Sequence, residues 1–351
     1  MALQNYATQS GRINKLLGEI LAHAIPVEVT GQVGVQKPIP SNKGDTVIFR
    51  RWIPVGSSNV NQFFANGTGD RGNALVQSLT TSEGVSPNVN SLSAQDYSVT
   101  LQQIAIGFGY SDKMADLYED DVPSEMKAQV GQQLGLAREM MRFGAIKGVT
   151  NKFYGGTGTT RATVNGKITL NILRKIARSL KANHAEQINK ALKSDVAYGT
   201  VSVEPSYVVF CHTDLEADIR DLPKFKSAYD YGQGQNRMIR EIGTCEDFRF
   251  VTSPELIPVQ DGGAAVGATG LASTTGTNID VYQVIMAGKD AWGQVMLRGE
   301  NAAAVNWLKP NQVDKNDMFG QRGYVTAKNY FNAVVLNPLW VAVAEVGVTA
   351  Y

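Results

Sequence analysis

The chain has 351 residues, 43% of them hydrophobic and 19% charged, with a formal net charge of +1. This length allows a large core in two or three lobes, and the near-neutral balance excludes a global field that would drive the chain to nucleic acid or a membrane. Only two cysteines occur, Cys211 and Cys245, too few for the disulfide framework of a small secreted protein.

The N-terminal segment has the apolar spacing of an amphipathic helix. Its apolar residues recur at intervals of 3, 1, 3, 1 and 3 between Ile13 and Ala24, with Ser10 as a candidate N-cap and Pro26 as the end. We expect no signal peptide, because no positive charge precedes a continuous apolar block. An arm on the protein's own surface is at least as well supported as a membrane or partner helix. Residues 27–45 then read as extended.

Two alternating strands surround a polar loop. Thr46–Val55 and Tyr97–Tyr110 have the period of two that half-buried strands show. Of the 40 residues at 56–95, which lie between these strands, 24 are Gly, Ser, Thr, Asn or Gln. An isolated two-stranded ribbon is marginally stable, so this one must rest on its own subunit or on a neighbour. The second strand changes phase, which we interpret as a β-bulge near Gln102–Gln103.

A long helix is predicted next. Pro123 suits a first helical position, and apolar residues follow at intervals of 4, 4, 3, 4, 4 and 4. These intervals predict about seven helical turns. The apolar positions are Met126, Val130, Leu134, Ala137, Met141, Ala145 and Val149.

The second half of the chain mixes strands with short helices. Thr169 is predicted to cap a helix through Leu180, and Thr213–Glu216 reads as a capping box. Gly262–Thr277 reads as a mobile, low-complexity loop. The order of elements indicates an α+β fold. Strands are predicted at 206–211, 248–252, 281–287, 292–297, 324–336 and 339–346.

Catalytic and metal-binding motifs are missing from the sequence. None of the three histidines has metal-ligand spacing. Cys211 and His212 are neighbours on a predicted strand, so they point to opposite faces and cannot form a nucleophile–base pair. The glycines do not form a phosphate-binding loop. We therefore expect no catalytic, cofactor or metal site, and no membrane-spanning segment.

Charge is strongly separated along the chain. Residues 112–125 carry six acidic residues and one base, whereas residues 138–193 carry twelve bases and two acids. These groups can be solvated helix faces, complementary patches between like subunits, or a phosphate-facing surface. Candidate inter-subunit contacts are the apolar anchors of the polar loop and the charges near the long helix: Phe63, Phe64, Asp120, Asp121, Arg138 and Arg142.

Several phrases in the second half resemble the major capsid proteins of tailed bacteriophages, of the coat family typified by the coliphage called N-four. Glu241–Glu255 resembles the family's passage of Glu-Ile-Gly, a strand and Ser-x-Glu. Gly288–Leu297 and Gly320–Pro338 resemble its later strands. Tyr207–Tyr231 is similar as well. The matching segments are in the family order and cover nearly the whole chain.

The resemblance implies the tailed-phage capsid fold and its division into segments. The loop would lie across a neighbouring subunit, and some family members crosslink covalently through a lysine there. No lysine stands between Lys43 and Lys113 in this chain, which excludes that bond. The implied segments are an N-terminal arm (1–45), an extended β-hairpin loop (46–110), a peripheral domain (111–200) with a spine helix (123–149), an axial domain (201–300), and C-terminal strands returning to the peripheral domain (301–351).

The function implied is structural self-assembly rather than catalysis. Many copies would form pentamers and hexamers of an icosahedral shell around double-stranded DNA, in the virion, after assembly in the host cytoplasm. The expected partners are the chain itself, scaffolding, portal and decoration proteins, and packaged DNA bound non-specifically. Two alternatives are an α+β enzyme or ligand-binding protein without a recognisable site, and a DNA-binding protein that uses residues 138–193.

Overall fold

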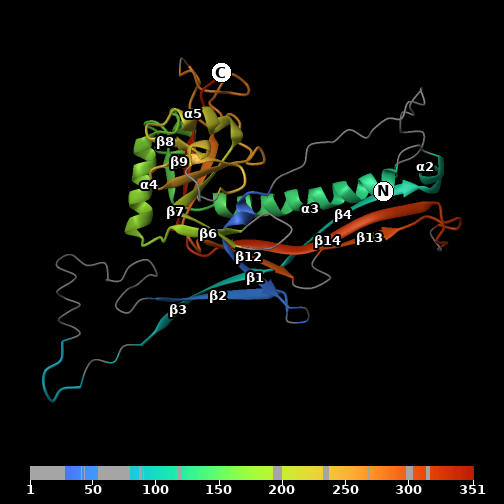
Figure 1. Cartoon of the computed structure of the whole chain (residues 1–351), viewed down its shortest axis with the longest axis horizontal. Coiled ribbons are helices and arrows are strands. Elements are labelled where there is room, and N and C mark those ends of the chain that lie inside the picture. The colour runs from blue at the N-terminus through green and yellow to red at the C-terminus, as the bar shows by residue number, and fades with distance from the viewer. Residues whose placement is uncertain are drawn as a thin grey trace.

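The computed structural model describes residues 28–40, 42, 44–53, 80–86, 89, 91–117, 121–192, 200–231, 237–267, 269–297, 303–313 and 317–351. Two sheets carry the fold, which is α+β as predicted. One sheet forms a compact body, and the other forms a long body that lies under a long helix (Figure 1). A separate two-stranded ribbon extends below both bodies. We call the two parts the eight-stranded body and the five-stranded body.

The eight-stranded body is buried on both faces of its sheet. Every residue of β10, β11 and β15 is buried, which explains their nearly continuous apolar sequences. Helix α4 (Leu170–Ala182) packs on one face, and the end of α3 contributes Phe143 and Ile146 to the other. The strand order is β5-β15-β11-β7-β10-β9-β8, with β6 also on β7. The strands are β5 (Lys152–Tyr154), β6 (Ile188–Leu192), β7 (Thr200–Cys211), β8 (Phe225–Ser227), β9 (Glu241–Cys245), β10 (Phe248–Thr252), β11 (Tyr282–Ala287) and β15 (Val341–Val346).

The five-stranded body is covered on one face by the long helix α3 (Val122–Lys147). The strand order is β1-β12-β14-β13, and β4 pairs with the other edge of β14. The apolar residues Met126, Val130 and Leu134 of α3 pack on Tyr110 and Val325 of the sheet. The short helix α2 (Asp112–Leu117) lies at the far end. The strands are β1 (Val35–Ile39), β4 (Gln102–Ser111), β12 (Trp292–Leu297), β13 (Ala303–Leu308) and β14 (Arg322–Val335).

The remaining helices are short. They are η2 (Thr30–Gln32), η3 (Arg161–Thr163), η4 (Thr213–Leu215), α5 (Glu216–Arg220) and η5 (Ala228–Asp230). The predicted capping box at Thr213–Glu216 is wrong, because the cap is the residue before it: the His212 Nδ1 accepts a hydrogen bond from the Asp214 N–H at 3.1 Å. The Thr169 cap of α4 is confirmed, since its hydroxyl accepts from the Ile172 N–H.

Helix α3 confirms the predicted long helix within one residue at its start and two at its end, but its buried face differs from the predicted one. Met126, Val130 and Leu134 are buried as expected. Beyond them the buried positions are Glu139, Arg142, Phe143 and Ile146, while Ala137, Met141 and Ala145 are only half-buried. The contact face therefore includes two charged residues that an apolar pattern cannot identify.

The ribbon consists of β2 (Thr46–Ile53) and β3 (Ser93–Thr100), paired antiparallel. The predicted β-bulge at Gln102–Gln103 is wrong. The chain changes sheet at Leu101, so that β3 stays in the ribbon and β4 joins the five-stranded sheet. This change of sheet explains why the apolar residues change parity. Val99 faces the sheet beneath the ribbon, whereas Ile104, Ile106 and Phe108 face α3.

The sheets also divide the chain differently from the predicted segments. Strand β12 lies within the predicted axial segment but belongs to the five-stranded sheet. Strands β5 and β15 and helix α4 fall in predicted peripheral segments but pack in the eight-stranded body. The loop at 262–277 is held by backbone hydrogen bonds, including Ala264 N–H to Val164 O at 3.0 Å and Ala272 N–H to Val348 O at 2.7 Å.

Candidate assembly surfaces

The root of the ribbon rests on the five-stranded sheet of its own subunit. Val47 and Val99 are buried against Ile39 and Val295. The ring of Phe49 fills the space above Gly293, where a Cβ atom would lie 2.9 Å from it. The Asn332 side chain donates to Thr100 O at 2.7 Å. The ribbon is thus supported at its base without a neighbour, one of the two alternatives that the sequence left open.

A cation also secures the inner face of the ribbon. The Arg51 guanidinium stacks over Trp340 of the eight-stranded body, 4.3 Å from the ring centroid. Its Nη2 donates to Asp290 O at 3.3 Å. Burial lowers the pKa of Arg51, but an arginine stays charged at any physiological pH. This contact ties the ribbon to both bodies.

The opposite face of the ribbon carries large apolar side chains that are more than half exposed. The register places Ile48 opposite Ser98, Arg50 opposite Asp96, and Trp52 opposite Ala94. Ile48 is 52% exposed and Trp52 is 58% exposed. Between them Arg50 and Asp96 form two hydrogen bonds of 2.8 Å. Ile48 and Trp52 therefore lie on one exposed face of the ribbon, which makes this face a candidate contact surface.

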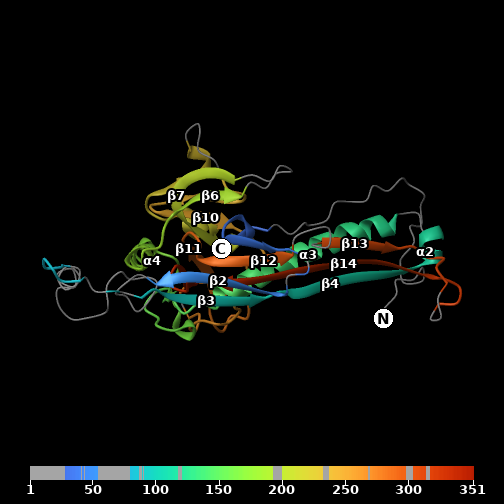
Figure 2. The ribbon, with the colours of Figure 1, turned by 90° about the horizontal axis from the view of Figure 1, so that it is seen from below.

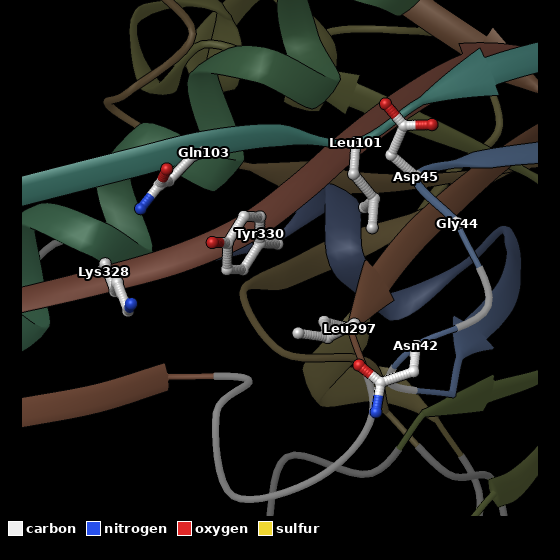
Figure 3. A pocket seen from close by; sticks show the side chains of 8 residues that line it. All are labelled: Asn42, Gly44, Asp45, Leu101, Gln103, Leu297, Lys328 and Tyr330. Atoms are coloured by element: carbon white, nitrogen blue, oxygen red, sulfur yellow. The ribbon is translucent and has the colours of Figure 1, made fainter.

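Where the ribbon leaves the sheet, the surface is hollow (Figure 3). The hollow has a volume of about 470 Å³. Leu101, Leu297 and Tyr330 give it an apolar part, and it is also lined by one base, Lys328, and one acid, Asp45. A second hollow of about 340 Å³ lies farther along the same sheet and shares Gln103 and Lys328 with the first. Together they form a trough along the sheet.

Residues 28–33 are fixed to α3 by the buried carboxylate of Glu139, which is 1% exposed. Its Oε1 accepts from the N–H groups of Val29 at 3.2 Å and Thr30 at 3.0 Å. Its Oε2 accepts from the Thr30 hydroxyl at 2.6 Å. Gln32 then pairs reciprocally with the backbone of Ile239 in the eight-stranded body. This short segment therefore joins the two bodies.

The two predicted arginine contacts are engaged within the chain. Arg142 is 4% exposed, and its Nη1 donates to Glu28 at 2.7 Å while its Nε donates to Gln294 at 2.8 Å. Arg138 donates to the other oxygen of Glu28 at 2.6 Å. Arg142 therefore holds residue 28 against α3 within the subunit, and only 4% of Arg142 is exposed.

Asp121 is the other described candidate, and it caps α3. Its Oδ1 accepts from the Ser124 N–H at 3.3 Å and its Oδ2 from the Ser124 hydroxyl at 2.5 Å. A carboxylate at this position also interacts favourably with the helix dipole. Phe63, Phe64 and Asp120 lie outside the described residues. The sequence analysis did not name Ile48 and Trp52 as candidate contacts, although their alternation with Val47 and Phe49 already placed them on one face.

The described part of the chain offers little chemistry. Its His, Cys, Asp and Glu side chains form no group of three or more that could hold a metal ion. The Cys211 thiol is fully buried, and this burial raises its pKa, so it is a poor nucleophile. None of the helices in the described ranges is long and apolar enough to cross a membrane.

Comparison with known proteins gives a consistent match. The phage capsid protein family model matches residues 95–344. The major capsid protein of Pseudomonas phage KPP21 is 20% identical over 348 residues, covering 90% of this chain and 87% of that protein. The capsid of Ralstonia phage GP4 is similar in fold, with a TM-score of 0.65, 12% identity and 99% of both chains covered. The capsid of cyanophage Pam1 has a TM-score of 0.58 and 13% identity, with 99% and 98% of the chains covered.

These likenesses cover the ribbon root, both sheets and the long helix. The family model alone spans well over half of the chain, from within β3 to within β15. The chain therefore belongs to the phage capsid protein family, and it is a structural major capsid protein.

Proposed function

We propose that copies of this chain assemble as pentamers and hexamers into a closed icosahedral shell around double-stranded DNA. Membership in the capsid family supports self-association. The observation that carries the proposal is the two-faced ribbon. One face is anchored on its own subunit, and the other presents Ile48 and Trp52 to solvent.

The contact made by the ribbon is non-covalent in this proposal. No lysine occurs between Lys43 and Lys113, so the loop cannot supply one for an isopeptide bond. Burying the exposed parts of Ile48 and Trp52 would contribute about 2 kcal/mol per subunit, since full burial of such a side chain is worth about 1.5–3 kcal/mol. A closed shell repeats this contact in every subunit.

Other partners and contacts follow from the same proposal. Scaffolding, portal and decoration proteins would join the shell during assembly in the host cytoplasm, and the packaged DNA would be bound non-specifically. Phe63 and Phe64 would contact a neighbouring copy from the loop, and Asp120 and Asp121 would do so from the start of α3. Arg138, half-buried beside Glu28, would take part through its remaining donors.

The test is assembly of a variant in which the exposed indole is removed. Trp52→Ser should fold as the parent does, because Trp52 faces solvent, but its yield of particles should fall at least tenfold. Trp52→Phe is the matched control, since it keeps an aromatic ring at the same position. Sedimentation and electron microscopy measure particles, and circular dichroism measures folding. Normal particle yield from folded Trp52→Ser would contradict a lattice role for this face.

A further inference from the structure

Over most of its length, strand β4 has no strand partner on one side among the residues that the structure describes. It lies at the edge of the five-stranded sheet and, among the described strands, pairs only with β14 (Figure 2). The hydrogen bond from Asp112 N–H to Gln321 O fixes which residues face β14. In an antiparallel ladder, bonded pairs alternate. With this register, the even-numbered residues of β4 bond to β14 and the odd-numbered residues point their N–H and C=O groups away.

The outward-pointing groups belong to Gln103, Ala105, Gly107 and Gly109. No described residue lies where it could pair with them as a further strand. Proteins usually block such an edge with lysine, proline, a bulge or a covering element. Residues 102–110 contain no charge and no proline. In the described part of the chain, the outer edge of β4 therefore lacks these protections and is open to pairing with a strand of another chain.

The surface beside this edge has room for the side chains of an added strand. The side chains of Gln103 and Ala105 lie on the face opposite α3, as does the Cα of Gly107, and all three residues are exposed. The 340 Å³ hollow lies on this face, between β4 and β13. Gly107 is also required locally, because a Cβ there would lie 2.9 Å from the Thr326 methyl group.

We infer that the outer edge of β4 receives an extended segment from a second copy of this chain, which adds a strand to the five-stranded sheet. Main-chain hydrogen bonds would supply the affinity, as in other cases of strand addition. The occupant is a second copy because capsid proteins associate with copies of themselves. The inference rests on the proposed assembly into shells.

Hydrogen exchange of the peptide 102–111 tests the inference in the unmodified protein. In separate subunits, the amides of Ile104, Ile106 and Phe108 should exchange slowly, and those of Gln103, Ala105 and Gly107 should exchange rapidly. In shells assembled from the purified chain alone, the odd-numbered amides should slow at least a hundredfold. Shells with unchanged odd-numbered amides would overturn the inference alone, whereas failure to form any shell would count against the proposed function.

Two variants of Ala105 distinguish the effect of losing its backbone N–H group from the effect of a larger side chain. Ala105→Pro removes an outward N–H, a change that edge strands accept, and it should lower particle yield at least tenfold. Ala105→Val adds similar volume but keeps the N–H, and it should assemble normally. Equal loss in both variants, or normal assembly of Ala105→Pro, would overturn the inference. If Ala105→Pro does not fold, the exchange pattern of the wild-type shell decides.

Discussion

Single buried charges hold this subunit together at places where the chain changes direction. Glu139 accepts three hydrogen bonds from residues 29 and 30 and lies 3.3 Å from the Arg142 Nη1. Removing one partner of a buried ion pair leaves an uncompensated charge. The side chains that join residues 28–33 to α3 are therefore expected to be among the most sensitive in the protein.

Glu139→Ala should lower the free energy of unfolding by about 3 kcal/mol, the usual cost of breaking a buried pair. Glu125→Ala on the same helix should cost only about 0.5 kcal/mol, because Glu125 is partly exposed and its bond to Gln129 is a local helical contact. Urea unfolding of the subunit measures both. Equal effects in the two variants would show that the Glu139 contacts contribute no special stability.

Acid should weaken the eight-stranded body through Glu345. Burial by itself would raise the pKa of this carboxyl, but hydrogen bonds from Arg161 and the charges of Arg161 and Lys152 outweigh it, so the pKa lies below its ordinary 4.5. Between pH 4.5 and the lower pKa of folded Glu345, this carboxyl is protonated in the unfolded chain but not in the folded chain. The stabilisation is thus complete above pH 4.5 and is lost as the pH falls through the folded pKa.

The measurement is the urea midpoint of the wild type and of Glu345→Gln between pH 7 and pH 2. The variant should be less stable at pH 7, because Arg161 loses its charged partner. It should also lose less stability on acidification than the wild type. Parallel pH curves for the two proteins would contradict the assignment of acid sensitivity to Glu345.

At the scale of elements, two consecutive strands joined at Leu101 belong to two different sheets. The residues from Ser93 to Ser111 form β3 in the ribbon and then β4 in the five-stranded sheet, with the side-chain parity reversed at Leu101. The reversal turns the apolar side chains from the face under the ribbon to the face under α3. This junction fixes the direction in which the ribbon leaves the subunit.

The two faces of β2 should respond differently to truncation. Phe49→Ala removes a ring packed on Gly293 and should speed hydrogen exchange of residues 93–100 in separate subunits. Ile48→Ala, one residue away on the exposed face, should leave that exchange unchanged and should reduce particle yield instead. Hydrogen exchange and sedimentation measure the two effects. Faster exchange in Ile48→Ala would show that Ile48 also packs against its own subunit and stabilises the ribbon there.

At the scale of the whole molecule, the ribbon root and the bodies form one supported unit, because Arg51 stacks on Trp340 while Val47 and Val99 pack on β1 and β12. The 39 residues between β2 and β3, 54–92, connect its two strands. Replacing them by Asn-Gly, a turn that suits a two-residue hairpin, should leave a soluble subunit whose unfolding temperature is close to that of the wild type. The same protein should form no stable shells.

Electron microscopy and sedimentation decide this prediction, with calorimetry as the check on folding. The control is an inserted Gly-Ser pair within 54–92, which lengthens the loop but keeps its residues. Normal shells from the shortened chain would show that the loop is dispensable for assembly. An unfolded product would show that the ribbon root needs the loop for stability.

The sequence alone determined the local elements and the family. Period-two alternation located β2 and the extended run that contains the end of β3 and most of β4, and the spacing from Met126 to Leu134 located α3, because each pattern depends on residues near one another in the chain. The ordered phrases from Tyr207 to Pro338 indicated the capsid family, which the family model confirms. None of these signals depends on knowing which distant residues meet.

Only the tertiary structure decided the contacts between distant segments. Burial of Glu139 and Arg142 depends on residues 28–30, more than 100 positions away, and the sequence pattern of α3 gives no sign of it. The change of sheet at Leu101 and the position of β15 in the eight-stranded body likewise depend on which strand lies alongside. Period-two patterning states which face of a strand is buried, but it does not state what buries that face or which edge remains open.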